Sequence, residues 1–247
     1  MKKPPTPLIV IAALAATMLF PTLPAEARTP KPDRLKANIG ADLVSGYVWR
    51  GVYQAGSGMS IQPSLGIEYK GFGIGAWGST SLTGGFKELD LCVGYETHGF
   101  AIRATDYWWA GQGTPFYSRY LDSHLIEGAL SYRFGDKTPL SLEWHTFFAG
   151  NLDKDATGKR QYSSYLQIAY DFEIKGIECT AAVGAAPWNA PAWLPSQDGK
   201  KGFRISNISL TAARKIRITD RYSPPVFVQA VASPATDDAN LIFGISF

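Results

Sequence analysis

The sequence is poor in the residues on which several classes of protein depend. Two cysteines among 247 residues are too few for a disulfide scaffold, and the three histidines have no spacing that suits a zinc site. The excess of 24 basic over 21 acidic residues is too small to indicate a nucleic-acid partner. No uninterrupted apolar run reaches about 18 residues, which excludes a bundle of membrane-spanning helices. Aromatic residues are abundant instead, at 13%, and they favour β structure.

The first 27 residues have the pattern of a secretory signal peptide. Lys2 and Lys3 precede an apolar stretch over 8–20, and residues 25–27 are Ala-Glu-Ala, a small-x-small cleavage pattern. The apolar stretch is too short to cross a hydrocarbon core of about 30 Å as a helix, so we expect a cleaved signal rather than an anchor. The expected organisation is a signal peptide over 1–27, a short periplasmic tail over 28–36 and one domain over 37–247.

The remainder of the chain alternates between apolar and polar residues with a period of two. In 86–96, for example, Leu89, Leu91 and Val93 share one face, while Glu88 and Asp90 share the other. Such alternation is typical of β-strands. The predicted strands are 37–49, 59–70, 72–82, 86–96, 100–110, 121–133, 139–149, 161–172, 177–187, 204–215, 223–232 and 239–247.

The connections between these strands predict an outer-membrane barrel. Short turns alternate with longer connections, which are 50–58, 111–120, 150–160, 188–203 and 233–238, and the short 83–85 is the exception. Transmembrane barrels combine strands of about 9–11 residues with short turns on one side and longer loops on the other. A soluble β-sandwich also alternates, but aromatic residues, among them Tyr47 and Trp49, recur here near strand ends, as in interfacial girdles. We therefore predict an all-β, up-and-down antiparallel transmembrane barrel of about twelve strands.

Several short motifs resemble a known bacterial family. They are Tyr47-Val-Trp-Arg-Gly51, Ile61-Gln-Pro-Ser64, Gly75-Ala-Trp-Gly-Ser79, Glu88-Leu-Asp-Leu91, Thr105-Asp-Tyr-Trp108, Phe147-Phe-Ala-Gly150, Pro187-Trp-Asn189 and Pro234-Ala-Thr236. Together they resemble the TorF-like outer-membrane porins, a conserved bacterial family of unknown function. The resemblance covers most of 37–247 and implies an outer-membrane barrel with a pore, but no catalytic or binding residues. The C-terminal Phe247, after alternating apolar residues, also resembles the signal read by the bacterial barrel-assembly machinery.

Charged residues on the inward face are the main candidates for function. The pattern predicts that Asp42, Glu68, Glu88, Asp90, Arg103, Glu127, Arg133, Glu143, His145, Asp171 and Glu178 line the lumen, and that Arg50 and Lys215 also face inward. Two interpretations are open. The charges either form ion pairs that fill a narrow barrel, or they surround a water-filled pore, in which an excess of carboxylates favours cations. In the second case, exchange of Glu88 and Asp90 for lysine would move the selectivity toward anions.

Aromatic residues in the longer connections form a second candidate set. The third connection and its flank contain Trp108, Trp109 and Tyr117, and the fifth contains Trp188 and Trp193. Such residues either stack on sugars or fold into the pore mouth, and the fifth connection is expected to act as a partial lid.

Other motifs give little support for chemistry. Residues 73–78 match G-x-G-x-x-G but lie inside a predicted strand, which excludes a dinucleotide loop. His124 has no suitably placed serine for a membrane-embedded lipid hydrolase. Cys92 and Cys179 are expected on opposite faces of distant strands, as two free thiols.

The leading hypothesis is a passive pore for ions or small polar solutes with mild cation preference. It involves no enzyme activity, cofactor, metal or nucleic acid, and its partners are outer-membrane lipid and the solutes. The alternatives are a closed structural or adhesion barrel that binds a partner through its loops, and a lipid hydrolase.

Overall fold

The computed structural model describes residues 34–110, 115–135, 137–194 and 202–247. The predicted signal peptide lies outside this part of the chain.

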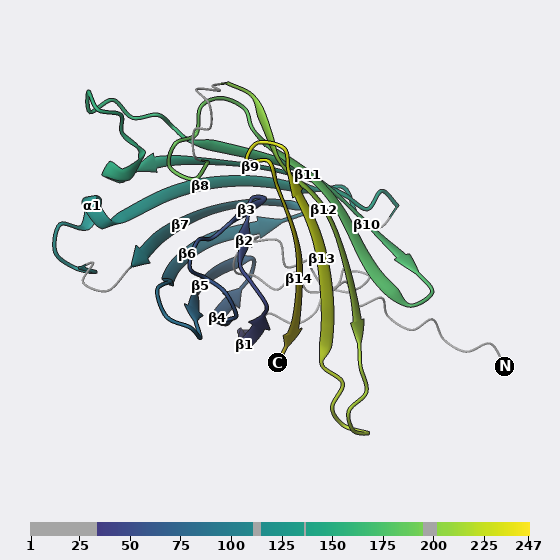
Figure 1. Cartoon of the computed structure of the whole chain (residues 1–247). Helices are drawn as coiled ribbons and strands as arrows, with labels where there is room; N and C mark the ends of the chain where they lie inside the picture. The colour runs from purple at the N-terminus through teal and green to yellow at the C-terminus, as the bar shows by residue number, and fades with distance from the viewer. Residues whose placement is uncertain (1–33, 111–114, 136, 195–201) are drawn as a thin grey trace.

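Twelve antiparallel strands close into a barrel, in which each strand pairs with its neighbours in sequence and β1 closes the ring against β14 (Figure 1). The wall strands are β1 (Lys36–Val44), β4 (Ser60–Tyr69), β5 (Phe72–Ser81), β6 (Lys87–Thr97), β7 (Phe100–Ala110), β8 (His124–Arg133), β9 (Leu140–Ala149), β10 (Ser164–Ile174), β11 (Ile177–Ala186), β12 (Arg204–Lys215), β13 (Pro225–Ser233) and β14 (Asp238–Ser246). The predicted fold class is confirmed.

Connections of two kinds define the two ends of the barrel. At the end called the turn side, neighbouring strands are joined by 70–71, 98–99, 134–139, 175–176 and 216–224. At the other end, called the loop side, they are joined by 45–59, 82–86, 111–123, 150–163, 187–203 and 234–237. The loop side also carries the short helices α1 (Tyr120–Ser123) and η1 (Asn151–Asp153). The described residues include no helix that is long and apolar enough to cross a membrane.

The first predicted strand is wrong at its end. We expected a strand over 37–49 followed by an outer loop over 50–58, but β1 ends at Val44. The chain then forms a separate two-stranded hairpin, β2 (Val48–Trp49) and β3 (Val52–Tyr53), which lies inside the outline of the barrel in Figure 1. Alternation continues from β1 into this hairpin, so the sequence pattern does not mark the point where the chain leaves the wall.

The outer face of the barrel is apolar on all twelve strands. Exposed large apolar side chains occur on each strand, among them Ile39, Leu65, Ile74, Val93, Ile102, Leu130, Leu142, Ile168, Val183, Leu210, Val228 and Leu241. An apolar surface that continues over every strand of a closed ring is unusual for a soluble monomer, whose largest apolar patch is about 300–600 Å². Aromatic pairs lie near the turn side of this surface, with ring centroids 4.5 Å apart in Phe72–Tyr95 and 6.2 Å apart in Tyr170–Phe172.

The two cysteines are free, as predicted. Cys92 is buried on the inward face of β6, whereas Cys179 lies on β11 beside the inward Glu178 and therefore points outward.

Candidate functional site: a plugged lumen

Residues 45–59, called the plug hairpin from here on, fill the loop-side half of the lumen. At its tip, Trp49 is 2% exposed and packs against four aromatic rings. The ring centroids lie 5.5 Å away for Tyr107, 5.5 Å for Trp109, 6.4 Å for Phe147 and 6.5 Å for Trp193. Three of these rings come from the barrel wall and Trp193 comes from the β11–β12 connection. The hairpin is therefore held by the wall and covered by a second loop.

The plug hairpin also contacts the opposite part of the ring. Val48 belongs to an apolar cluster with Val44, Phe227, Val231 and Ile242, which come from β1, β13 and β14. The plug hairpin has only two-residue strands, so its contacts with two opposite parts of the wall explain why it holds one position inside the barrel.

Gly51 lies at the turn of the plug hairpin and fits closely against β12. Its φ of +81° favours glycine, and a Cβ atom added there would clash with the carbonyl oxygen of Ser206. The clash involves backbone, so a side-chain rotation cannot relieve it.

Gly51→Ala is therefore expected to displace the plug hairpin. Arg50 is 7% exposed in the closed barrel, so the native protein should resist trypsin at this residue, whereas the variant should be cut there many times faster. Gly84→Ala is the matched control, because Gly84 has a φ of +82° with no atom near its Cβ position. Equal cleavage after Arg50 in both variants would contradict the close fit.

A network of charged side chains joins the plug hairpin to the wall. The Arg50 guanidinium donates to Glu127 on β8 over 2.5 Å, and the Tyr107 hydroxyl donates to the same carboxylate over 3.0 Å. His145 on β9 lies between two carboxylates, with Nδ1 2.9 Å from Glu127 and Nε2 3.2 Å from Glu143. The side chains of Arg50 and Glu127 are only 4% and 1% exposed. This is a buried ion pair, whose partners depend on each other because neither has water as an alternative.

Aromatic rings enclose the Arg50 guanidinium. Its central carbon lies 4.3 Å from the ring centroid of Trp49, 5.0 Å from that of Tyr165 and 5.5 Å from that of Trp193. Cation–π contacts of this kind are strongest where water is excluded. The cage and the Glu127 carboxylate together fix the tip of the plug hairpin.

A small pocket with mostly polar lining residues lies beside the plug hairpin. Its lining is Val48, Arg50, Gly51, Glu143, His145, Tyr165, Gln167, Asn207, Gln229 and Val231. Some of these groups bond to each other, since the Tyr165 hydroxyl donates to Gln167 Oε1 over 2.7 Å and Asn207 Nδ2 donates to the same oxygen over 3.2 Å. The pocket is thus lined mainly by groups that hydrogen bond to water or to a polar solute.

The turn-side half of the lumen has a different lining. Its inward positions carry small residues, including Gly40, Gly66, Gly73, Gly75, Gly94, Ala101, Ser131, Ser141 and Gly244. Charged residues lie on the same face, among them Glu68, Arg103, Arg133, Asp171 and Glu178. Bulky side chains therefore concentrate at the loop side, where the plug hairpin lies.

Comparison with known proteins decides the family. The sequence model of a family described as "Bacterial protein of unknown function (Gcw_chp)" matches residues 26–192. The chain belongs to the Gcw_chp family. The match includes the plug hairpin, Glu127 and His145, and it ends before Trp193 and Asn207.

Two further comparisons complete the findings for this Gcw_chp protein. No curated protein matches its sequence. A solved structure described as "KdgM porin" matches it with a TM-score of 0.44 at 10% identity, over 86% of this chain and 96% of that chain.

All eleven residues predicted to line the pore of the Gcw_chp barrel lie on inward-facing positions. They differ in how deeply they are buried and in which residues they contact. Glu88, Asp90, Glu127 and His145 are buried around the plug hairpin. The remaining seven are partly exposed, namely Asp42, Glu68, Arg103, Arg133, Glu143, Asp171 and Glu178. Glu68 pairs with Lys36 at 3.6 Å, and Asp171 accepts a hydrogen bond from Thr180 over 2.6 Å.

The predicted loop aromatics do not form one group. Trp109 points inward from β7 and Trp193 is buried against the plug hairpin, which agrees with the expected constriction of the mouth. Tyr117 is 87% exposed. Trp108 and Trp188 lie instead on the outer side, where Trp108 packs against Phe116 at 5.2 Å and Trp188 against Trp144 at 5.6 Å. A single aromatic surface for sugar stacking is therefore absent from these five residues.

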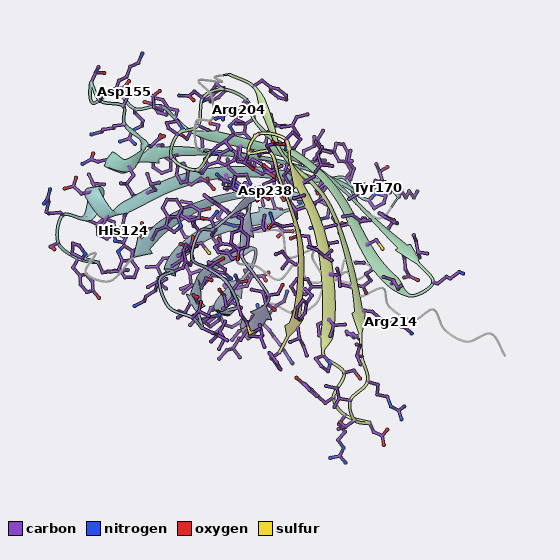
Figure 2. All side chains as sticks on the ribbon, viewed as in Figure 1. His124, Asp155, Tyr170, Arg204, Arg214 and Asp238 are labelled. Carbon is purple, nitrogen blue, oxygen red and sulfur yellow. The ribbon has the colours of Figure 1, made fainter. Side chains whose placement is uncertain are left out.

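His124 lies on the outer side of β8, at the loop side (Figure 2). Its Nδ1 is 2.9 Å from Asp106 and its Nε2 is 3.0 Å from the Phe116 carbonyl oxygen, and the Tyr120 ring stacks on it with centroids 3.7 Å apart. Neither nitrogen is left to activate a serine, so the arrangement anchors the connection before β8 rather than resembling a hydrolase site. The described part of the chain also holds no cluster of three or more His, Cys, Asp or Glu placed to bind a metal.

Sequence reasoning missed the role of Tyr47 and Trp49 in this Gcw_chp barrel. Both were expected at the membrane interface near a strand end, but they are buried in the lumen at 5% and 2% exposure. The neighbouring Ser45-Gly46 and Gly56-Ser57-Gly58 are the only local signal that the segment leaves the wall. Arg50 was expected to point inward, and it does so from the plug hairpin instead of a wall strand.

Proposed function

We propose that this chain is a channel of the bacterial outer membrane for ions and small polar solutes, restricted at its loop side by the plug hairpin. The observation that carries the proposal is that apolar side chains face outward and polar side chains face inward, the reverse of a soluble protein. Large apolar side chains are exposed on every wall strand, whereas charged and small residues face the lumen. Lipid outside and water inside is the arrangement that stabilises such a surface.

The proposed location agrees with the features of the two ends of the chain. The signal peptide over 1–27 would direct export, and Phe247 is 62% exposed at the end of β14, where the barrel-assembly machinery would contact it. The motifs similar to TorF-like porins support the same assignment.

We further propose a mild preference for cations. Among the residues predicted to face inward, and outside the buried groups around the plug hairpin, the carboxylates of Asp42, Glu68, Glu143, Asp171 and Glu178 outnumber the basic Arg103, Arg133 and Lys215. Fixed charges in a narrow lumen raise the local concentration of the opposite ion.

Planar-bilayer recordings of the purified protein test this proposal. We expect small conductance steps at high salt and, in a KCl gradient, a reversal potential of cation-selective sign. Glu88 and Asp90 are poor choices for a charge exchange because they are 3% and 0% exposed. The double variant Asp171→Lys/Glu178→Lys, on the less crowded turn side, should instead move the reversal potential toward anion selectivity. An unchanged potential would show that these carboxylates do not set it.

A closed structural or adhesion barrel is the second candidate, because the plug hairpin occupies the loop-side lumen. The two functions differ in one measurement. A closed barrel gives no conductance even after removal of the plug hairpin, whereas a channel then conducts strongly.

A further inference from the structure

Two carboxyl groups of β6 are buried together without a basic partner. Asp90 is 0% exposed and Glu88 is 3% exposed, and both point into the lumen from positions two residues apart. The indole Nε1 of Trp109 donates to Glu88 Oε1 over 2.6 Å. Neither oxygen of Asp90 meets the geometry of a hydrogen bond among the described residues, and the same is true of Glu88 Oε2, although the two carboxyl groups lie close enough to act on each other.

A third oxygen points at the same place from the plug hairpin. Tyr47 is 5% exposed, and its ring packs between Trp77 and Phe86, with centroids 5.4 Å and 5.7 Å away. The hydroxyl does not meet the geometry of a hydrogen bond, but it lies close enough to Glu88 to act on that carboxyl, and Asp90 is the next charged group that acts on it. A wall strand and the plug hairpin thus present unsatisfied oxygen atoms to one another.

The basic side chains nearby are engaged elsewhere. Arg50 donates to Glu127, and His145 lies between Glu127 and Glu143. Lys87 lies over the Trp108 ring at 5.3 Å, on the other face of the wall. Arg103 acts on Glu143 and Cys92.

We propose that Glu88, Asp90 and the Tyr47 hydroxyl bind a divalent cation of the Ca²⁺ type. Two buried carboxylates without compensation are strongly unfavourable, and one divalent ion neutralises both charges. Ca²⁺ accepts carboxylate and neutral oxygen ligands in irregular geometry, whereas Mg²⁺ requires a near-ideal octahedron. Because Tyr47 belongs to the plug hairpin, the bound ion joins the plug to the wall.

The test is a Ca²⁺ titration of the full chain, refolded in a non-ionic detergent and stripped with EDTA. The intrinsic tryptophan fluorescence, to which Trp109 beside Glu88 contributes, should change with half-saturation on the order of 10⁻⁴–10⁻³ M, the range of extracellular Ca²⁺ modules. The thermal unfolding midpoint should rise with Ca²⁺, because ligand binding stabilises the folded state. Mg²⁺ and Na⁺ at the same ionic strength should give much smaller shifts.

Three variants separate this site from non-specific binding. Glu88→Gln/Asp90→Asn preserves shape and should abolish the Ca²⁺ response, while Tyr47→Phe should weaken it several-fold. Asp171→Asn, an inward carboxylate on β10 bonded to Thr180, should keep the full response. The proposal fails if the native chain shows no saturable response, or if the double variant responds equally. A double variant that is more stable than a Ca²⁺-insensitive native chain would show that the carboxyls share a proton instead. Channel activity does not enter these measurements.

Discussion

Replacement of residues 45–59 by a two-residue Asn-Gly turn is expected to raise the single-channel conductance of the barrel several-fold. Val44 and Ser60 face each other directly in the β1–β4 pair, so a two-residue type I′ turn can join them without a change of register. The replacement removes Trp49 and Arg50 from the lumen and leaves the wall strands intact. Recordings in planar bilayers, with the native chain beside the variant, measure the effect.

The matched control is a variant in which a loop outside the lumen is shortened. Lys154 and Arg160 also face each other, as an isolated bridge, and Asp155 lies at the tip of the β9–β10 connection, away from the barrel (Figure 2). Replacement of residues 155–159 by Asn-Gly should leave the conductance unchanged. If neither the native chain nor the shortened hairpin variant conducts, the channel proposal fails and the closed barrel is favoured. If both shortened variants conduct alike, the plug hairpin is not the restriction.

Glu127→Gln is expected to destabilise the plugged barrel by about 3–5 kcal/mol, the usual cost of removing one partner from a buried ion pair. The substitution leaves the Arg50 guanidinium in its aromatic cage without its hydrogen-bonded counter-charge, and it also removes the carboxylate beside His145 Nδ1. Urea unfolding in detergent micelles measures the loss, and trypsin cleavage after Arg50 reports whether the plug hairpin leaves the lumen.

Two further variants show whether the loss of stability in Glu127→Gln comes from the broken Arg50–Glu127 ion pair. Glu143→Gln removes a carboxylate that is 16% exposed and contacts His145 alone among these groups, so its effect should be clearly smaller. The double variant Arg50→Met/Glu127→Gln removes both charges and should be more stable than Glu127→Gln. Equal losses in Glu127→Gln and Glu143→Gln would mean that the pair with Arg50 does not hold the plug hairpin.

The wall of the barrel was predictable because its signal is local. Each strand alternates within a window of about ten residues, and the predicted strands differ from the observed ones by a few residues at most, except at β1. The assignment of Cys92 and Glu127 to the inward face follows from the same alternation. Trp109 was expected only among the loop aromatics, and its inward position on β7 and its bond to Glu88 depend on the strand and its pairing.

The plug hairpin was not predictable, because alternation distinguishes two faces but not what each face meets. Tyr47 and Trp49 share the outward face with Ile39 and Leu43 in the simple pattern, so a continuous strand fitted the residues as well as a break at Ser45 did. Only the closed ring brings Trp49 against Phe147 and Trp193, which are distant in sequence. For the same reason, the partner of Glu127 could not be chosen among the several inward arginines.

The sequence by itself determined the strand number, the two faces and the residues that point inward, since a period of two is a property of the single strand. The tertiary structure alone decided whether the inward charges surround open space or a buried segment. Ring closure sets which distant side chains meet, and the Arg50–Glu127 pair, the Tyr47 contact with β6 and the polar pocket all arise from such meetings.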